Sequence, residues 1–416
     1  MRDGLSAMKL LGRLLVVVGL AGAACGAMAA GSPDVVVFEL PGTTNHGTPV
    51  DGIRGYSVGT TSCNVGTLPL NWCDAAGGCG AGTTARDHPV IAQGMYRLKN
   101  GRMDQIGSSW LKHGFLSLNQ SSAGCGNGTC VSPPLGGRQL GVGCTDPYSS
   151  GLNGTRPLGR KSEVNPATGA YPFPFGGGGA TATLWNQRVA VAESDMIAAQ
   201  NPGARYFVEG QYIAPDDALS GNGFNNASYR EVTVSAGTFN LTMVGPTVRQ
   251  VPAIDAWAVI DNTVQIFRVD IPGAPVERFN VALKVTEVTP GSLWHYEYAV
   301  HNLNSARAAD ALRITFAGNT TFSAAGFHDV NAHSNEPYDT ADWPSTTGAS
   351  SIEWAAPAFP SSPNDANAIR WSTTYNFWFD ANQPPSQIDS MVLDLFTAGT
   401  PTQVEFGQAV FSNGFE

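Results

Sequence analysis

Two neighbouring stretches of this chain alternate apolar and polar residues, and this alternation constrains the fold most strongly. Between 279 and 285 the odd positions hold Phe, Val, Leu and Val, and between 294 and 300 the even positions hold Trp, Tyr, Tyr and Val. A Thr-Pro-Gly-Ser turn at 289–292 separates them. Because successive side chains of a strand point to opposite faces, the pattern predicts a β-hairpin with one buried face.

Further alternating runs begin at Phe239, Trp371 and Met391, and turn residues lie between them. A second hairpin is predicted at 95–106, where Asn100-Gly101 supplies the positive φ angles of a two-residue turn. The chain holds 49 Gly and 27 Pro and only 13% charged residues, a composition typical of short strands joined by many turns. We therefore expect an all-β protein with an antiparallel β-sandwich.

The amino terminus has the three regions of a secretory signal peptide. Basic residues at 2, 9 and 13 precede an apolar run at 14–24 and the small-residue triplet Ala27-Met28-Ala29. This pattern predicts cleavage after Ala29 and export to the periplasm, the cell surface or the medium. No later stretch is long and apolar enough to predict a transmembrane segment.

Six cysteines remain after signal removal, and all lie in the first half of the mature chain: Cys63, Cys73, Cys79, Cys125, Cys130 and Cys144. An even number in an oxidising compartment predicts three disulfides rather than a metal site. Six cysteines allow fifteen pairings. Short loops favour Cys73–Cys79 and Cys125–Cys130, which leaves Cys63–Cys144.

These features predict a loop-rich, disulfide-bonded first region and a sandwich-like second region. The expected boundaries are a signal peptide at 1–29, the first region at 30–200, the sandwich at 201–411 and a tail at 412–416. The tail, Ser-Asn-Gly-Phe-Glu, is interpreted either as a sorting tag or as a frayed end. The formal net charge of −10 and the lack of a basic cluster argue against nucleic-acid binding.

Histidines and carboxylates gather in the second region. His295, Glu297 and His301 differ by even numbers and therefore project from one face of the expected strand. The following loop adds nitrogen and oxygen donors at His328, Asp329, His333 and Glu336, so the seven residues are candidate ligands for Zn²⁺ or Ca²⁺. The alternative is an ordinary polar outer face beside a loop held by its own Asn and Asp side chains.

The disulfide-bonded region offers weaker candidates. His88 and His113, with Arg138, Asp146 and Tyr148 nearby in sequence, either form a second site or satisfy backbone groups.

Two further sequence features bear on function. Gly55-Tyr-Ser-Val-Gly59 matches the G-x-S-x-G pattern of serine hydrolases, but a poor helix former follows it, which argues against a nucleophile. Trp378 is out of phase with its aromatic neighbours and should point away from the core. It then stacks on a sugar, or packs beneath a loop or against the first region.

Several stretches resemble a family of exported bacterial proteins with a β-sandwich-like carboxyl-terminal half. They are residues 110–115, 143–154, 204–212, 295–305 and 326–330. The resemblance implies one coherent secreted unit and assigns no catalytic residue.

Two functions fit the sequence. The first is a non-catalytic protein that binds a glycan, Ca²⁺ or another component of the cell envelope. The second is a metal-dependent hydrolase in which Glu297 or Glu336 acts as general base. The second requires at least three of the candidate ligands to converge on one point.

Overall fold

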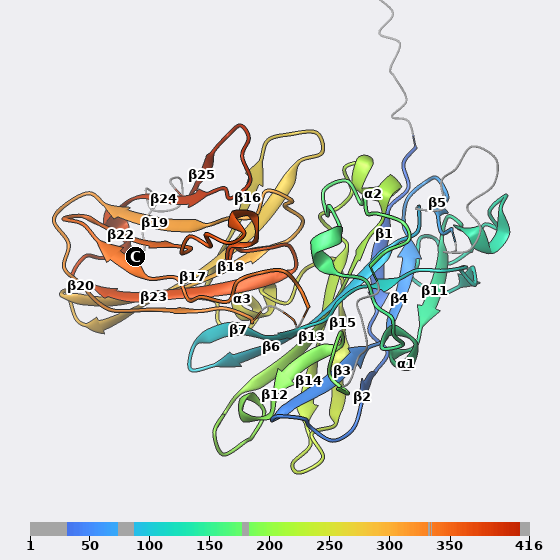
Figure 1. Ribbon diagram of the computed structural model, residues 1–416, viewed down its shortest axis with the longest axis horizontal. Coiled ribbons are helices and arrows are strands. Elements are labelled where there is room, and N and C mark those ends of the chain that lie inside the picture. Colours follow the sequence, from blue (N-terminus) through green and yellow to red (C-terminus); the bar gives the residue numbers. More distant parts are fainter. Residues whose placement is uncertain (1–30, 74–86, 177–182, 332, 334, 408–416) are drawn as a thin grey trace, which may run out of the picture. The chain divides into compact units, whose positions relative to one another are not determined.

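The alternating strands of the second half form two antiparallel sheets that face each other (Figure 1). In the computed structural model, which describes residues 31–73, 87–176, 183–331, 333 and 335–407, the first sheet has the order β16-β17-β18-β23-β20 and the second the order β21-β22-β19-β24-β25. The bounds of the first sheet are β16 (Gln265–Ile271), β17 (Glu277–Thr289), β18 (Leu293–Asn302), β20 (Phe322–His328) and β23 (Thr373–Ala381). Those of the second are β19 (Ala311–Phe316), β21 (Ser345–Thr347), β22 (Ser351–Ala355), β24 (Ile388–Asp394) and β25 (Gln403–Phe406).

The predicted hairpin at 279–300 is confirmed as β17 and β18. Val281 pairs with Val300 and Leu283 with Tyr298, and all four side chains lie in the core between the two sheets. Gly291 has a φ of +65° in the connecting turn, a conformation that glycine adopts without strain. The β-sandwich expected from the alternation is therefore present.

The first region consists of smaller sheets around one longer sheet. Its bounds are β1 (Val35–Glu39), β2 (Thr43–Asn45), β3 (Ile53–Val58), β4 (Thr60–Asn64), β5 (Leu70–Asn71), β6 (Val90–Lys99), β7 (Arg102–Ser108), β8 (Lys112–His113), β9 (Gln120–Ser121), β10 (Gln139–Leu140), β11 (Cys144–Tyr148), β12 (Val189–Ala192), β13 (Arg205–Ile213), β14 (Ala227–Val234) and β15 (Leu241–Val248). The long sheet has the order β15-β14-β13-β6-β7, with β8 also paired to β6. The described residues also form three short α-helices, α1 (Ser150–Asn153), α2 (Pro215–Leu219) and α3 (Asp255–Ile260). With the short 3-10 helices included, this described part is 8% helix and 43% strand.

The second predicted hairpin is also confirmed. Strands β6 and β7 meet at Asn100 and Gly101, whose φ angles of +52° and +78° are those of the expected turn.

The strands change sheet near residue 250, not near residue 200. Strands β13 to β15 follow residue 200 but belong to the sheet of β6, with which β13 pairs, and the sandwich begins only at β16. The described strands all belong to one compact unit that spans Ser32–Glu416. The predicted signal peptide and tail lie outside the described residues. Within the described ranges, no helix has the length and apolar character needed to cross a membrane.

Two of the predicted disulfide pairings are wrong. The structure pairs Cys63 with Cys125 and Cys130 with Cys144. Thr145 lies opposite Cys63 in the pairing of β11 with β4, so the neighbouring Cys144 points to the other face of that sheet and cannot reach Cys63. The third predicted bridge, Cys73–Cys79, involves a cysteine that lies outside the described residues.

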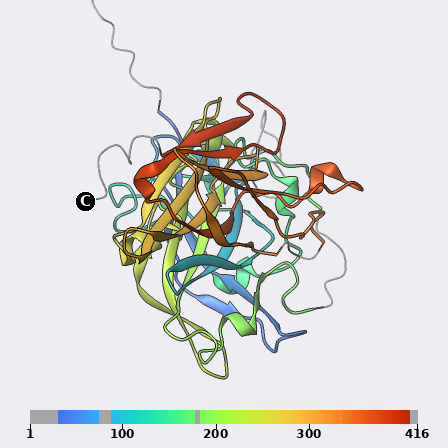
Figure 2. The same cartoon turned by 90° about the vertical axis from the view of Figure 1, so that its left-hand side faces the viewer.

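Part of the outer face of the first sandwich sheet is buried, which differs from the ordinary polar surface that was one interpretation of the sequence. Strand β7 lies beside β23 (Figures 1 and 2), and Asn376 Nδ2 donates to the Met103 carbonyl at 2.9 Å. Gln105 bonds the β23 backbone twice: its Nε2 donates to the Ser372 carbonyl at 3.2 Å, and its Oε1 accepts from Thr374 N–H at 2.8 Å. The alternation shows that a face is polar but not that a second layer covers it.

His301 lies in this buried layer. Its Nδ1 is 3.0 Å from Thr374 Oγ1, and its Nε2 is buried without a hydrogen-bond partner among the described residues. Burial, reinforced by the charges of Arg268 and Lys161, lowers the pKa of His301 to about 3.

Removing the Cys63–Cys125 bridge should destabilise the protein more than removing Cys130–Cys144. The two bridges span 62 and 14 residues. Loop-closure entropy assigns them about 4 and about 3 kcal/mol respectively. Urea unfolding of the two Cys→Ser pair variants checks the order, and an equal or reversed order would contradict it.

His301 should make the protein less stable in acid. The unfolded chain takes up a proton on this ring below about pH 6.5, whereas the folded ring stays neutral down to about pH 3. The free energy of unfolding of His301→Gln should therefore fall less than that of the wild type between pH 6.5 and 4, by at most about 1.4 kcal/mol per pH unit. Urea unfolding of both proteins at pH 6.5 and pH 4 measures this difference in the free energy of unfolding.

His295→Gln is the matched control. A hydrogen bond to Glu297 raises the pKa of His295, so protonation of this ring stabilises the folded state. The free energy of unfolding of His295→Gln should therefore fall more than that of the wild type as the pH is lowered. Identical pH slopes for both variants would refute the assignment.

Candidate binding cleft

The seven predicted metal ligands do not converge. His295 and Glu297 are adjacent, with Nε2 and Oε2 3.2 Å apart. His301 projects from the same face of β18, as predicted, but six residues of extended strand place it about 20 Å away. Among the described residues, no three His, Cys, Asp or Glu side chains are arranged to hold a metal ion.

The remaining four candidates have other partners. His333 Nε2 lies 3.0 Å from the Arg188 carbonyl. Asp329 accepts from Asn367 Nδ2 at 2.7 Å, and Glu336 accepts from the Lys161 backbone N–H at 2.7 Å. His328, at the end of β20, is half-exposed and has Nε2 3.7 Å from Asp104 Oδ2.

The candidates in the disulfide-bonded region hold the fold together. His88 Nε2 and His113 Nδ1 are 2.8 Å apart in a buried pair beside Tyr171. Asp146 accepts from the Leu118 N–H, and the Tyr148 hydroxyl donates to the Phe115 carbonyl.

The G-x-S-x-G serine is structural. Ser57 lies in strand β3 with 1% of its surface exposed, and its hydroxyl donates to the Ser150 carbonyl at 2.6 Å. A nucleophile of this motif needs a sharp turn between a strand and a helix, which β3 does not provide.

The residues that do converge line a cleft between the β6–β7 hairpin and the sandwich. Its first cavity has a volume of about 410 Å³. Lining side chains come from both regions of the chain: Arg97, Lys99, Asn100, Arg102 and Asp104 from the hairpin, and His295, Glu297, Phe327, His328 and Trp378 from the sandwich.

One row of hydrogen bonds joins three residues that line this cavity to Asp380. Asp380 Oδ1 is 2.6 Å from His295 Nδ1, and His295 Nε2 contacts Glu297. Glu297 in turn accepts from Arg102 Nε at 2.5 Å and from Nη2 at 3.0 Å. The hydrogen bond to Glu297, followed by that to Asp380, raises the pKa of His295. A ring that donates from both nitrogens is the charged form, so the carboxylates stabilise imidazolium.

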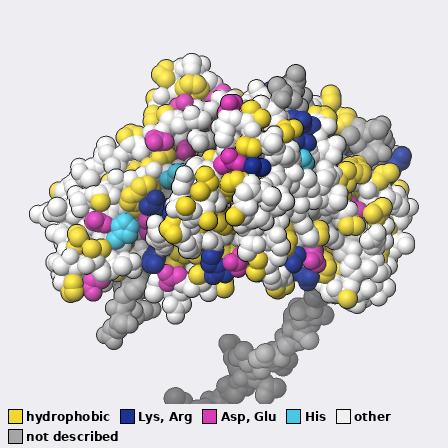
Figure 3. Space-filling model, turned by 90° about the horizontal axis from the view of Figure 1, so that it is seen from below, with side chains coloured by type: hydrophobic (Ala, Val, Ile, Leu, Met, Phe, Trp, Pro, Cys, Tyr) yellow, Lys and Arg dark blue, Asp and Glu magenta, His cyan; other side chains and the backbone are white. Residues whose placement is uncertain are grey.

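A second ionic group flanks the first. Arg97 donates to Asp104 at 2.6 Å and to Asp195 at 2.9 Å, while Lys99 Nζ donates to the Asn201 side chain at 3.0 Å. This group therefore holds two cations and two carboxylates, although Lys99 bonds to uncharged partners. On the face drawn in Figure 3, Lys and Arg side chains likewise lie beside Asp and Glu side chains.

Trp378 points away from the core, as predicted, and packs against the first region. Its neighbours Phe377 and Phe379 lie in the sandwich core, whereas its own ring carries the Arg102 guanidinium 3.5 Å above the ring centre. Gly326 lies on the adjacent strand, and a Cβ there would come within 2.1 Å of the indole. Only glycine lets the ring lie across β20 in this way.

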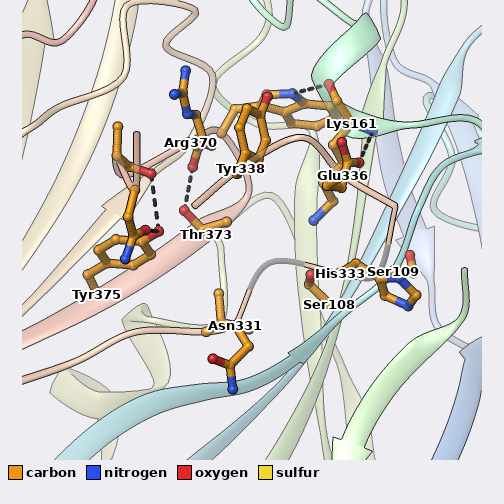
Figure 4. A pocket seen from close by; sticks show the side chains of 14 residues that line it. Ser108, Ser109, Lys161, Asn331, His333, Glu336, Tyr338, Arg370, Thr373 and Tyr375 are labelled. Atoms are coloured by element: carbon orange, nitrogen blue, oxygen red, sulfur yellow. Dashed lines mark hydrogen bonds between the residues drawn. The ribbon is translucent and has the colours of Figure 1, made fainter. Parts of the chain in front are cut away.

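A second cavity of about 310 Å³ continues the cleft, and His328 lines both cavities. Beyond it lies a recess of about 40 Å³ around Lys161, Glu336, Tyr338 and Arg370 (Figure 4), with room for a few water molecules. Lys161 is fully buried there, and burial lowers the pKa of its amino group to about 8.

Sequence reasoning found His295, Glu297, His328 and Trp378 but missed the cationic side of the cleft. Arg97 and Arg102 flank an Asn-Gly turn, and no local pattern shows which face of the sandwich a hairpin covers. The sequence could have pointed to Asp380, because this residue lies two positions after Trp378 on β23 and therefore projects from the same outer face of the strand.

No family model and no curated protein sequence matches this chain. Among solved structures, a crystal structure of the chitin-binding domain of a chitinase from Pyrococcus furiosus matches with 14% identity, covering 30% of this chain and 94% of that domain. A solution structure of the chitin-binding domain of the Pyrococcus furiosus chitinase matches with 15% identity, covering 32% and 97%. Both have a TM-score of 0.18, at which the likeness carries no argument about the fold or ligand of this chain.

Proposed function

We propose that this chain is an exported, non-catalytic binding protein that holds a glycan in the cleft beside Trp378. The observation that carries the proposal is the internally neutral network of planar charged groups in the first cavity. Arg102, Glu297, His295 and Asp380 are fixed by one another, and the first three line a cavity of about 410 Å³.

Sugar hydroxyls both donate and accept hydrogen bonds, so they need fixed donors and acceptors side by side. The guanidinium forks supply donors, the carboxylates supply acceptors, and each partner holds the other in a defined orientation. The row of Arg102, Glu297, His295 and Asp380 pairs two cations with two carboxylates, and such a neutral row suits an uncharged, hydroxyl-rich ligand better than an anion or a cation.

The same network argues against proton transfer. A general base needs a free lone pair within reach of the substrate. Both ring nitrogens of His295 are engaged by carboxylates, and Glu297 is held by a bidentate arginine. The role of Trp378 is to position Arg102 by stacking and to present its edge to the ligand.

The predicted signal peptide and the two observed disulfides support an exported location, because disulfides persist in oxidising compartments. Periplasm, cell surface and medium remain alternatives within this proposal, and the glycan would belong to the cell envelope or its surroundings.

Arg102→Lys should weaken saccharide binding at least tenfold. Lysine keeps the charge but loses both the fork that grips Glu297 and the stacking on Trp378. Calorimetric titration of the oxidised mature protein with soluble oligosaccharides of glucose, N-acetylglucosamine and peptidoglycan measures the change.

Arg313→Lys is the matched control, because Arg313 also pairs with two carboxylates, Glu353 and Asp394, but lies on β19 in the other sheet of the sandwich. It should bind as the wild type does. Equal losses in both variants, or no saccharide binding by the wild type, would contradict the proposal.

A further inference from the structure

We infer that the ligand is a chain of several sugar units that runs through both cavities of the cleft, not a single sugar in the first. This inference rests on the proposed glycan-binding function and specifies the ligand class of the same site.

Two walls run along the whole cleft. On one side, β7 lines the first cavity with Arg102 and Asp104 and the second with Ile106 and Ser108. The segment 327–331 forms the other wall. Phe327 and His328 line the first cavity, and residues 328–331 line the second, so His328 belongs to both. The two cavities therefore adjoin at His328, where the two walls also touch, because His328 Nε2 lies 3.7 Å from Asp104 Oδ2.

The length of these walls exceeds one sugar ring. The six-residue step from Arg102 to Ser108 in β7 corresponds to about 20 Å of extended chain. The two cavities along these walls have volumes of about 410 Å³ and about 310 Å³. A single ring fills only part of that space and leaves the second cavity empty.

The second cavity has the chemistry of a second sugar subsite. Ile106, Trp185 and Val330 offer apolar surface of the kind that the C–H faces of sugar rings contact, and Asp195 and Asn331 offer hydrogen bonds. Asp195 also pairs with Arg97 of the first cavity at 2.9 Å, so the polar network continues from one cavity into the next.

An extended peptide is the competing occupant. Strands β7 and β20 are each last in the order of their sheet, and edge strands can add a peptide strand. The dense, paired side-chain charges of the first cavity favour hydroxyl groups over a peptide backbone. The test separates the two.

The experiment measures affinity against chain length. Oligomers of β-1,4-linked glucose and N-acetylglucosamine with one to six units are titrated into the oxidised mature protein, with a pool of unstructured six-residue peptides as the second arm. We expect the dissociation constant to fall at least tenfold between the dimer and the longer oligomers and then to level off.

Ala192→Phe, which fills the second cavity from β12, should remove this gain in affinity with length. The matched control is Ala355→Phe, the same change on strand β22 beside Asp394, which should keep the gain. Asn331→Trp, at an exposed loop position lining the second cavity, is a second blocking variant in case Ala192→Phe does not fold.

The outcomes are distinct. Saccharide binding that does not change with length, or a gain that survives both blocking variants, would overturn the chain inference and leave the proposed function intact. Failure of every saccharide to bind would overturn the proposed function itself. Binding of peptides in place of saccharides would overturn both.

Discussion

The structure depends on the packing of the β6–β7 hairpin against the outer face of the sandwich. This buried contact combines an apolar cluster, which joins Tyr96 and Met103 of the hairpin to Ala282 and Ala299 of the sandwich, with several amides. The amides must be satisfied by specific partners, because an unpaired buried group costs about 1–3 kcal/mol. Gln105 and Asn376 meet this requirement by bonding the backbone of the opposite strand. These bonds fix the register between the two regions, and that register in turn places Arg102 above Trp378.

The amino-acid sequence predicts the strands well, but it predicts poorly how the strands assemble into sheets and how the cysteines pair. The alternation at 279–300 and the Asn100-Gly101 turn identified two hairpins correctly, because both signals are local and follow from backbone geometry. The disulfides were mispaired because loop length says nothing about which face of a sheet a cysteine occupies. The sheet boundary was misplaced because strand pairing over more than a hundred residues, such as β13 with β6, leaves no local trace.

The same distinction holds for the cleft. Alternation correctly placed His295, Glu297 and His301 on one face, but it does not convert strand spacing into distance, so His301 was grouped with residues far along the same strand. The partners that decide the chemistry of the cleft, Arg97 and Arg102, lie almost two hundred positions earlier in the chain. Only the tertiary fold reveals that His295 is held by carboxylates, His333 by a backbone carbonyl and His301 by the Thr374 hydroxyl.

The division of the cleft between two regions has a consequence for how the protein matures. A chain synthesised from its amino end completes the hairpin with Arg97 and Arg102 long before Glu297, His328 or Trp378 exists. Arg97 finds its acidic partners Asp104 and Asp195 within the first region, but Arg102 lacks Glu297 until the sandwich has folded against the hairpin. The cleft, which takes its lining from both regions, is therefore complete only after the sandwich has folded against the hairpin.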